Sequence, residues 1–180
     1  MAEDTPIPPS RCNICLNMIV KNESRIITRL FDSVLPLIDS YCICDTGSTD
    51  DTIEIIREYF HQHQIPGKII QLPFRDFGYN RTQALLACET IPDADYILLI
   101  DADMKLRFSP NADIAAIKAR IATKPAHYLF QGCDKFYYRN IRLVRHGYSE
   151  GYWGVTHEYL ILPEGTDCSI FAKEELFVED

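Results

Sequence analysis

Two aspartates, Asp101 and Asp103, stand two positions apart directly after the apolar run 96–100. The run YILLI has the length and composition of a buried strand, so both carboxylates are expected in the loop at its carboxyl end. Two carboxylates at the rim of a sheet can share one hard divalent cation and the phosphates bound to it, and oxygen ligands suit magnesium or manganese. The alternative interpretation is a pair of solvated loop aspartates, because acids two residues apart are common.

A second acidic site, the sequence Asp45-Thr46-Gly47-Ser48, follows the apolar segment 41–44. The string D-T-G-S also occurs at the active site of aspartic proteases, which need two such aspartates sharing a proton in an all-β fold. Here the string precedes a helical pattern within a β-α-β arrangement. It is therefore interpreted as a strand-to-helix turn and not as a protease site.

Apolar strand-like segments alternate with amphipathic helical patterns through the first two-thirds of the chain. The expected strands cover 12–20, 41–44, 68–72 and 96–100, and the expected helices cover 26–34, 53–60, 79–89 and 113–122. This alternation is typical of an α/β domain with a mostly parallel central sheet and helices on both faces. Beyond residue 126, strand-like segments follow one another without helices, the last of them at 152–162. The C-terminal third is therefore expected to add mixed or antiparallel strands to the same sheet.

This layout predicts where the acidic residues lie. In open α/β sheets, ligands bind outside the carboxyl ends of the strands. Asp45 and the pair Asp101 and Asp103 each follow such an end. We therefore expect all three side chains to face one crevice.

The composition suits one globular domain, since 47% of the 180 residues are hydrophobic and 24% are charged. A net charge of −8 disfavours a nucleic-acid partner, because an acidic surface repels phosphate backbones. No apolar run approaches the roughly 18–20 residues of a transmembrane segment, and the acidic, proline-rich N-terminus is unlike a signal peptide. We therefore expect a cytoplasmic protein with a flexible arm at 1–11 and one domain at 12–180.

Seven cysteines are present, and four of them lie inside apolar runs. Without a signal peptide, reduced and buried thiols are the expected state. The pairs Cys12 with Cys15 and Cys42 with Cys44 are better explained as apolar strand residues than as a zinc site.

Five segments, in order along the chain, carry a resemblance to a known family: NICLNMIVKNES, CICDTGSTDDT, FRDFGYNRTQAL, YILLIDADM and GYWGVTHEYL. Together they span residues 13–162 and resemble the family-2 glycosyltransferases, in particular the subset that carries D-T-G-S-T-D. The resemblance implies a single Rossmann-like domain of the GT-A type that transfers a hexose or pentose with inversion at the anomeric carbon. It also implies a Mn²⁺ or Mg²⁺ ion at the D-x-D sequence and a UDP-sugar as donor. A glycan, a glycoprotein or a small molecule is the implied acceptor.

The same resemblance divides the chain into a nucleotide-sugar-binding half at 12–108 and an acceptor-side half at 109–180. The chain is short for this family, which leaves open that it is the N-terminal part of a longer protein.

The resemblance further implies roles for particular residues. Asp45 matches the family acid near the nucleoside, and Asp76 and Arg81 match the D-F-x-x-x-R segment near the donor. Arg81 is expected either to approach the donor diphosphate or to hold Asp76 or Asp101 in place. Asp101 matches the acid that meets the ribose or the metal, and Asp103 matches the acid that binds the metal.

The late segment Trp153-Gly154-x-x-His157-Glu158 resembles another family motif. Adjacent residues on a strand point to opposite faces, so at most one of His157 and Glu158 enters the crevice directly unless a bulge intervenes. Glu158 is expected to be the base that deprotonates the acceptor, with Asp134 as the rival. His157 is expected to contact the metal or a phosphate, unless it is a core histidine bonded to a backbone carbonyl. Trp153 either stacks on an acceptor sugar or fills the sheet face.

Two alternative functions remain open. A sugar-1-phosphate nucleotidyltransferase uses a similar sheet but normally has a glycine-rich, basic loop after its first strand, whereas this chain has VKNES there. A non-catalytic sugar-nucleotide-binding module is the other alternative, although the intact pair Asp101 and Asp103 argues against it.

Overall fold

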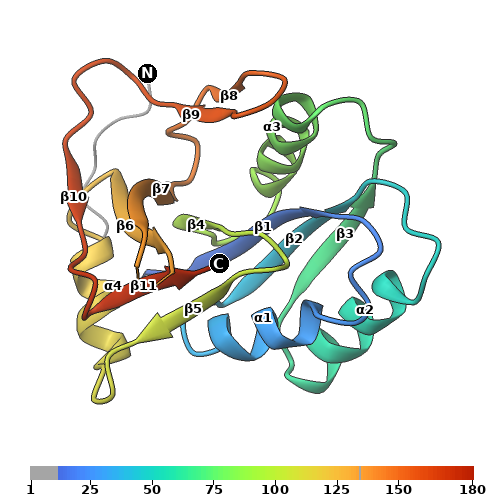
Figure 1. The fold of residues 1–180 in the computed structure, drawn as a ribbon, viewed down its shortest axis with the longest axis horizontal. Helices are drawn as coiled ribbons and strands as arrows, with labels where there is room; N and C mark the ends of the chain where they lie inside the picture. The colour runs from blue at the N-terminus through green and yellow to red at the C-terminus, as the bar shows by residue number, and fades with distance from the viewer. Residues whose placement is uncertain (1–11, 134) are drawn as a thin grey trace.

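The computed structural model describes residues 12–133 and 135–180 and has a central sheet (Figure 1). Within these ranges the sheet has nine strands in the order β3-β2-β1-β4-β7-β6-β11-β5, with β10 paired to β6. The first four strands in this order are mutually parallel. They are β1 (Ile14–Val20), β2 (Ser40–Asp45), β3 (Gly67–Gln71) and β4 (Tyr96–Leu99). The mostly parallel half expected from the sequence is confirmed.

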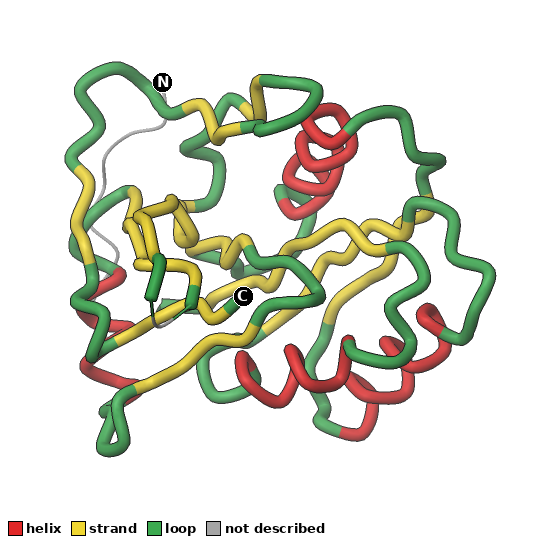
Figure 2. The backbone as a smooth tube through the Cα atoms, viewed as in Figure 1, coloured by secondary structure: helices red, strands yellow, loops and turns green. Residues whose placement is uncertain are grey.

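Helices cover both faces of the sheet (Figures 1 and 2). The helices are α1 (Ile27–Val34), α2 (Thr52–Gln62), α3 (Phe77–Cys88) and α4 (Ile114–Ile121). Phe31 of α1, Phe60 of α2 and Ile121 of α4 belong to the core on one face. Leu85 of α3 belongs to the second core on the other face. Within the described ranges, no helix combines the length and the apolar character needed to cross a membrane.

The C-terminal third adds mixed strands to the sheet, as expected. The strands of this third are β6 (Ala126–Gly132), β7 (Tyr137–Arg145), β10 (Cys168–Ile170) and β11 (Leu176–Glu179), and the short strand β5 (Lys105–Phe108) precedes them. Strand β7 lies antiparallel between β4 and β6, and β11 is parallel to β6 but antiparallel to β5. The strands β5, β10 and β11 were not expected, because each is only three or four residues long and pairs with a strand far away in the sequence.

The segment 152–162 corrects one expectation. Instead of joining the central sheet, it contributes to a separate two-stranded sheet of β8 (Gly151–Trp153) and β9 (Tyr159–Ile161). The backbone turns back between these strands, with φ of +109° at Gly154 and +55° at His157. A continuous strand cannot accommodate such left-handed conformations, which is why the segment folds as a hairpin.

The register of the parallel strands brings three loops to one edge. Val20, the last residue of β1, pairs with Asp45, the last residue of β2, and Asn17 pairs with Leu99 at the end of β4. The segments that follow β1, β2 and β4 therefore leave the sheet at the same side. This edge is the crevice side predicted from the sequence.

The strand cysteines are buried, as predicted. Cys15 lies with Cys88 in the core under α3, where their Sγ atoms are 3.7 Å apart. Burial raises the pKa of Cys12 to about 12 and that of Cys44 to about 11. These two thiols are therefore protonated and chemically inert at neutral pH.

Candidate active site

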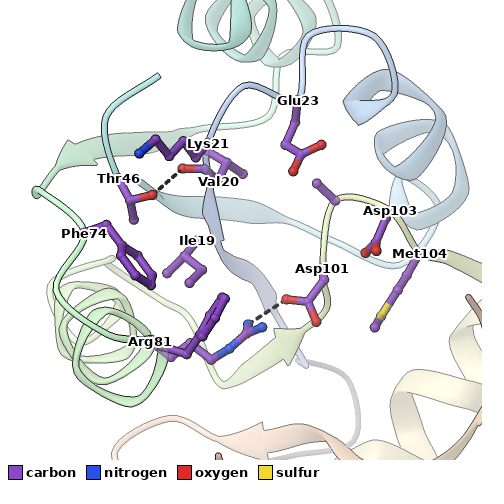
Figure 3. A pocket seen from close by; sticks show the side chains of 12 residues that line it. Ile19, Val20, Lys21, Glu23, Thr46, Phe74, Arg81, Asp101, Asp103 and Met104 are labelled. Carbon is purple, nitrogen blue, oxygen red and sulfur yellow. Dashed lines mark hydrogen bonds and ion pairs between the residues drawn. The ribbon is translucent and has the colours of Figure 1, made fainter. Parts of the chain in front are cut away.

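A cavity of about 520 Å³ lies at the carboxyl edge of the parallel strands (Figure 3). Its walls come from the end of β1 and the following loop, the loop after β2, the start of α3 and the turn after β4. The lining residues are Ile19, Val20, Lys21, Glu23, Thr46, Phe74, Phe77, Arg81, Asp101, Ala102, Asp103 and Met104. The cavity thus combines apolar walls with both acidic and basic side chains.

Arg81 is the central charged group of this cavity. Its Nη1 atom lies 2.6 Å from Asp101 Oδ1, and its Nε atom donates a hydrogen bond to Glu158 Oε1 at 2.7 Å. Burial acts to lower the pKa of Arg81, but the charge and hydrogen bond of Asp101, together with the charges of Tyr152 and Glu158, outweigh it, so the pKa lies above its ordinary value. Arg81 therefore stays charged. It links Asp101, at the carboxyl edge of the central sheet, to Glu158 of the hairpin formed by β8 and β9.

These ion pairs are shielded from water, since the side chains of Arg81 and Glu158 are 17% and 15% exposed. Removing one member of a fully buried ion pair costs roughly 3–5 kcal/mol, because the partner charge loses its compensation. Some solvent reaches this cluster, so the cost here is smaller. Even so, the arrangement fixes the directions of both carboxylates.

The hairpin is held against α3 by close backbone contacts. A Cβ atom built on Gly78 would lie 2.1 Å from the carbonyl oxygen of Gly154, so the two backbones approach as closely as glycine permits. The Thr82 hydroxyl donates to the carbonyl of Gly78 at 2.7 Å and accepts from the backbone N–H of Tyr152 at 2.9 Å. These contacts place the loop between β8 and β9 where Glu158 reaches Arg81.

The opposite part of the cavity is acidic. Glu23, in the loop after β1, points toward the turn that carries Asp101 and Asp103 (Figure 3). Burial, followed by the charges of Asp103, Asp50 and Asp101, raises the pKa of Glu23. This negative potential favours a bound cation.

The donor atoms present suit a hard divalent cation only in part. Asp101 and Asp103 offer carboxylate oxygens, which Mg²⁺ and Mn²⁺ prefer. Within residues 12–133 and 135–180, no group of three or more His, Cys, Asp or Glu side chains is arranged to hold a metal ion. A cation at this turn would therefore need further ligands from phosphate oxygens or water, which is usual for magnesium.

Comparison with known proteins decides the family. The model of a family described as glycosyl transferase family 2 matches residues 15–166, most of the chain. The chain belongs to glycosyl transferase family 2. This confirms the resemblance found in the sequence motifs.

Two curated relatives match about half of this family-2 chain. It is 34% identical over 89 residues to an uncharacterized glycosyltransferase of Rickettsia felis, and the match covers 49% of the chain and 28% of the relative. It is 33% identical over 94 residues to a TPR repeat-containing protein of Synechococcus elongatus, and this match covers 52% of the chain and 21% of that protein. The matched region thus spans about a quarter of the length of these relatives.

Solved structures of glycosyltransferases share the fold. S. aureus TarS 1-349, in complex with UDP, has a TM-score of 0.52 and 19% identity, over 69% of this chain and 37% of TarS. The mannosyltransferase PcManGT from Pyrobaculum calidifontis, in complex with GDP-Man and Mn²⁺, has a TM-score of 0.51 and 16% identity. This match covers 72% of the present chain and 38% of PcManGT. At these identities the likeness is one of fold, and the expected GT-A architecture is confirmed.

Two family-motif acids shape the backbone around the cavity. The Asp45 carboxylate is buried and accepts the backbone N–H groups of Gly47 at 3.1 Å and Ser48 at 3.1 Å. Asp76 caps α3 by accepting the N–H of Tyr79 at 2.7 Å. Neither aspartate is among the described residues that line the cavity, so the expectation that Asp45 faces the same crevice as Asp101 and Asp103 is wrong for its side chain. The predicted nucleotide contacts of Asp45 and Asp76 stay predictions.

The remaining predicted residues lie around the hairpin. The hairpin loop replaces the expected strand arrangement of His157 and Glu158, and only Glu158 turns to Arg81. His157 is exposed, so the alternative of a core histidine is wrong. Trp153 is 66% exposed and does not fill a sheet face. Asp134, the rival base, lies outside the described residues.

Sequence reasoning missed Glu23 and Arg142. Glu23 belongs to the segment VKNES after β1, and its position after a parallel strand was the available signal. Arg142 lies in the middle of β7 and is buried behind Asp101. A strand rich in arginine and tyrosine reads as a polar surface, so no pattern indicated a buried cation there.

Proposed function

We propose that this chain transfers a sugar from a nucleoside diphosphate donor to an acceptor hydroxyl, with a divalent cation and with inversion at the anomeric carbon. The main support is the cavity at the carboxyl edge of the sheet, where the Asp101–Asp103 turn faces Arg81. Arg81 in turn forms an ion pair with Glu158. Membership of glycosyl transferase family 2 supports this proposal, as does the shared fold with proteins solved with UDP and with GDP-Man and Mn²⁺.

The cavity offers suitable groups to each part of the donor. Phe74 and Phe77, whose ring centroids are 5.2 Å apart, provide an apolar wall for a nucleoside. Lys21 and Arg81 provide positive charge for the diphosphate. We propose a UDP-sugar as donor, with the uridine on the side of the aromatic wall.

Asp103 is the residue proposed to hold the cation. It lines the cavity and is exposed to solvent, whereas Asp101 already directs Oδ1 to Arg81. A Mg²⁺ or Mn²⁺ ion bound there supplies Lewis-acid neutralisation of the leaving diphosphate. Arg81 adds a permanent positive charge beside the leaving diphosphate.

Glu158 is the proposed base. Arg81 holds its Oε1 atom, so Oε2 is the oxygen that would meet an acceptor hydroxyl. The proton of the hydroxyl passes to Glu158 while the acceptor oxygen bonds to the anomeric carbon and the bond to the diphosphate breaks. The acceptor is a glycan, a glycoprotein or a small molecule, and Asp134 remains the proposed rival for the base.

A ligand panel tests the proposal. The chain is mixed with UDP-glucose, UDP-N-acetylglucosamine or GDP-mannose in Mn²⁺ or in EDTA. The melting temperature and the release of free nucleoside diphosphate are measured. A ligand at 100 times its Kd adds about 2.7 kcal/mol of stability, so a UDP-sugar should raise the melting temperature clearly in Mn²⁺. NMR of the product should show an inverted anomeric configuration. Binding without turnover would indicate a non-catalytic module. The absence of both binding and turnover would contradict the proposal.

A further inference from the structure

Arg142 is a buried arginine directly behind the Asp101–Asp103 turn. It projects from β7, and its side chain is 7% exposed. Its Nε atom donates to Gln131 Oε1 at 3.0 Å, and Nη1 donates to the carbonyl of Leu99 at 3.1 Å. Nη2 contacts the same Gln131 oxygen and the sulfur of Met104 at 3.4 Å. The guanidinium thus joins the end of β4 to the residue after Asp103.

The same guanidinium lies beside Asp101. Arg142 Nη1 is 3.8 Å from Asp101 Oδ2, while Arg81 Nη1 is 2.6 Å from Asp101 Oδ1. The two oxygens of this carboxylate therefore face two different guanidinium groups. With Glu158 at the far side of Arg81, the four charges alternate in the order Arg142, Asp101, Arg81, Glu158.

We infer that Arg142 is a positioning residue of the active site, which orients Asp101 and, through Arg81, the Glu158 loop. Without Arg142, the single charge of Arg81 would be shared between the two carboxylates of Asp101 and Glu158. With Arg142, the cluster contains two positive and two negative charges, so the charges cancel in a site that is largely shielded from water. Its three nitrogen atoms each have a partner, a geometry that the single ammonium of lysine cannot reproduce. This inference rests on the proposed function only in that Asp101 belongs to the donor site.

Gln131 supports this assignment. Its Oε1 atom accepts from Arg142, and its Nε2 atom donates to Asp180 Oδ1 at 3.0 Å. The amide is therefore held in one orientation, with its oxygen facing the guanidinium. This fixed amide oxygen in turn limits the orientations open to the guanidinium beside Asp101.

A double-mutant cycle between Arg142 and Asp101 tests the inference. The four proteins are the wild type, Arg142→Met, Asp101→Asn and the double variant, and the affinity for UDP in Mn²⁺ and in EDTA is measured by calorimetry. Because Arg142 acts through the Asp101 carboxylate, Arg142→Met should weaken binding by roughly tenfold in the wild type and by less than about twofold in Asp101→Asn. Equal losses in both backgrounds, or no loss, would overturn the inference. Arg139→Met is the matched control, since Arg139 lies exposed in the same strand.

A second measurement does not depend on ligand. Trp153 is the single tryptophan of the chain and lies in the hairpin that carries Glu158, so its fluorescence anisotropy reports motion of this hairpin. Both Arg142→Met and the charge-retaining Arg142→Lys should increase that motion, while Arg139→Met should not. If Arg142→Met fails to fold, Arg142→Lys replaces it in the cycle. A wild type that does not bind UDP would contradict the proposed function; unchanged Trp153 anisotropy in Arg142→Lys would contradict the positioning role itself.

Discussion

Replacing Gly78 by alanine should displace the hairpin from the helix that holds it. The added Cβ would lie 2.1 Å from the carbonyl oxygen of Gly154, whereas ordinary contacts begin at 3.4 Å, so the loop must retreat by about 1.3 Å. Glu158 follows Gly154 in the same loop and would move with it. A misplacement of about 1 Å at a catalytic group can lower a rate by about 100-fold.

The same substitution should change stability much less than activity. Alanine is favoured over glycine within a helix by about 1 kcal/mol, while the steric conflict costs about 1–3 kcal/mol. The net loss of about 0–2 kcal/mol corresponds to a fall of at most about 8 °C in the melting temperature of a domain of this size.

The assay compares Gly78→Ala with Leu86→Ala, a substitution at an exposed position of the same helix. The turnover number for sugar transfer, or for donor hydrolysis before an acceptor is known, should fall about 100-fold only in Gly78→Ala. The Kd for UDP should stay within about threefold, because the cavity is lined by Phe77 and not by Gly78. A normal turnover number with an unchanged melting temperature would refute the contact between Gly78 and Gly154.

Three further predictions address the metal, the base and acid stability. Asp103→Asn should abolish the difference in UDP affinity between Mn²⁺ and EDTA while the protein stays folded; a retained difference would show that the cation is bound elsewhere. Glu158→Gln should lower the transfer rate by roughly 10²–10⁴-fold, and a comparable loss in Asp134→Asn alone would move the base to Asp134. Burial lowers the pKa of His127 to about 4 against 6.5 for the free side chain, so its contribution to stability should be lost as the pH falls from 6.5 toward 4. Denaturation midpoints should decline less steeply over this range in His127→Gln, and an identical slope would contradict the assignment.

The parallel half of the fold was predictable because local patterns determine it. The strands that end at Val20, Asp45 and Leu99 are apolar runs that alternate with helical patterns, and their parallel pairing gives them a common carboxyl edge. The acidic turn at this edge followed directly, as did the burial of the strand cysteines.

The contacts that complete the site were not predictable in the same way. The approach of Gly78 to Gly154 and the bonds of Arg81 to Glu158 join residues far apart in the chain, and no periodicity encodes them. The left-handed conformation of His157 also broke a segment that reads as one strand. The burial of Arg142 could not be predicted either, because burial of an arginine depends on partners that only the folded chain provides.

The family motifs serve the site through backbone geometry as well as through side-chain chemistry. Asp76 starts α3 by capping the N–H of Tyr79, and Arg81 follows five positions later, about 7.5 Å along the helix axis. Loss of the cap in Asp76→Ala would fray the turn that carries Gly78, and Arg81 would lose its fixed approach to Asp101. A motif aspartate can therefore be essential to the site without contacting the substrate, and only its hydrogen-bond partner distinguishes the two roles.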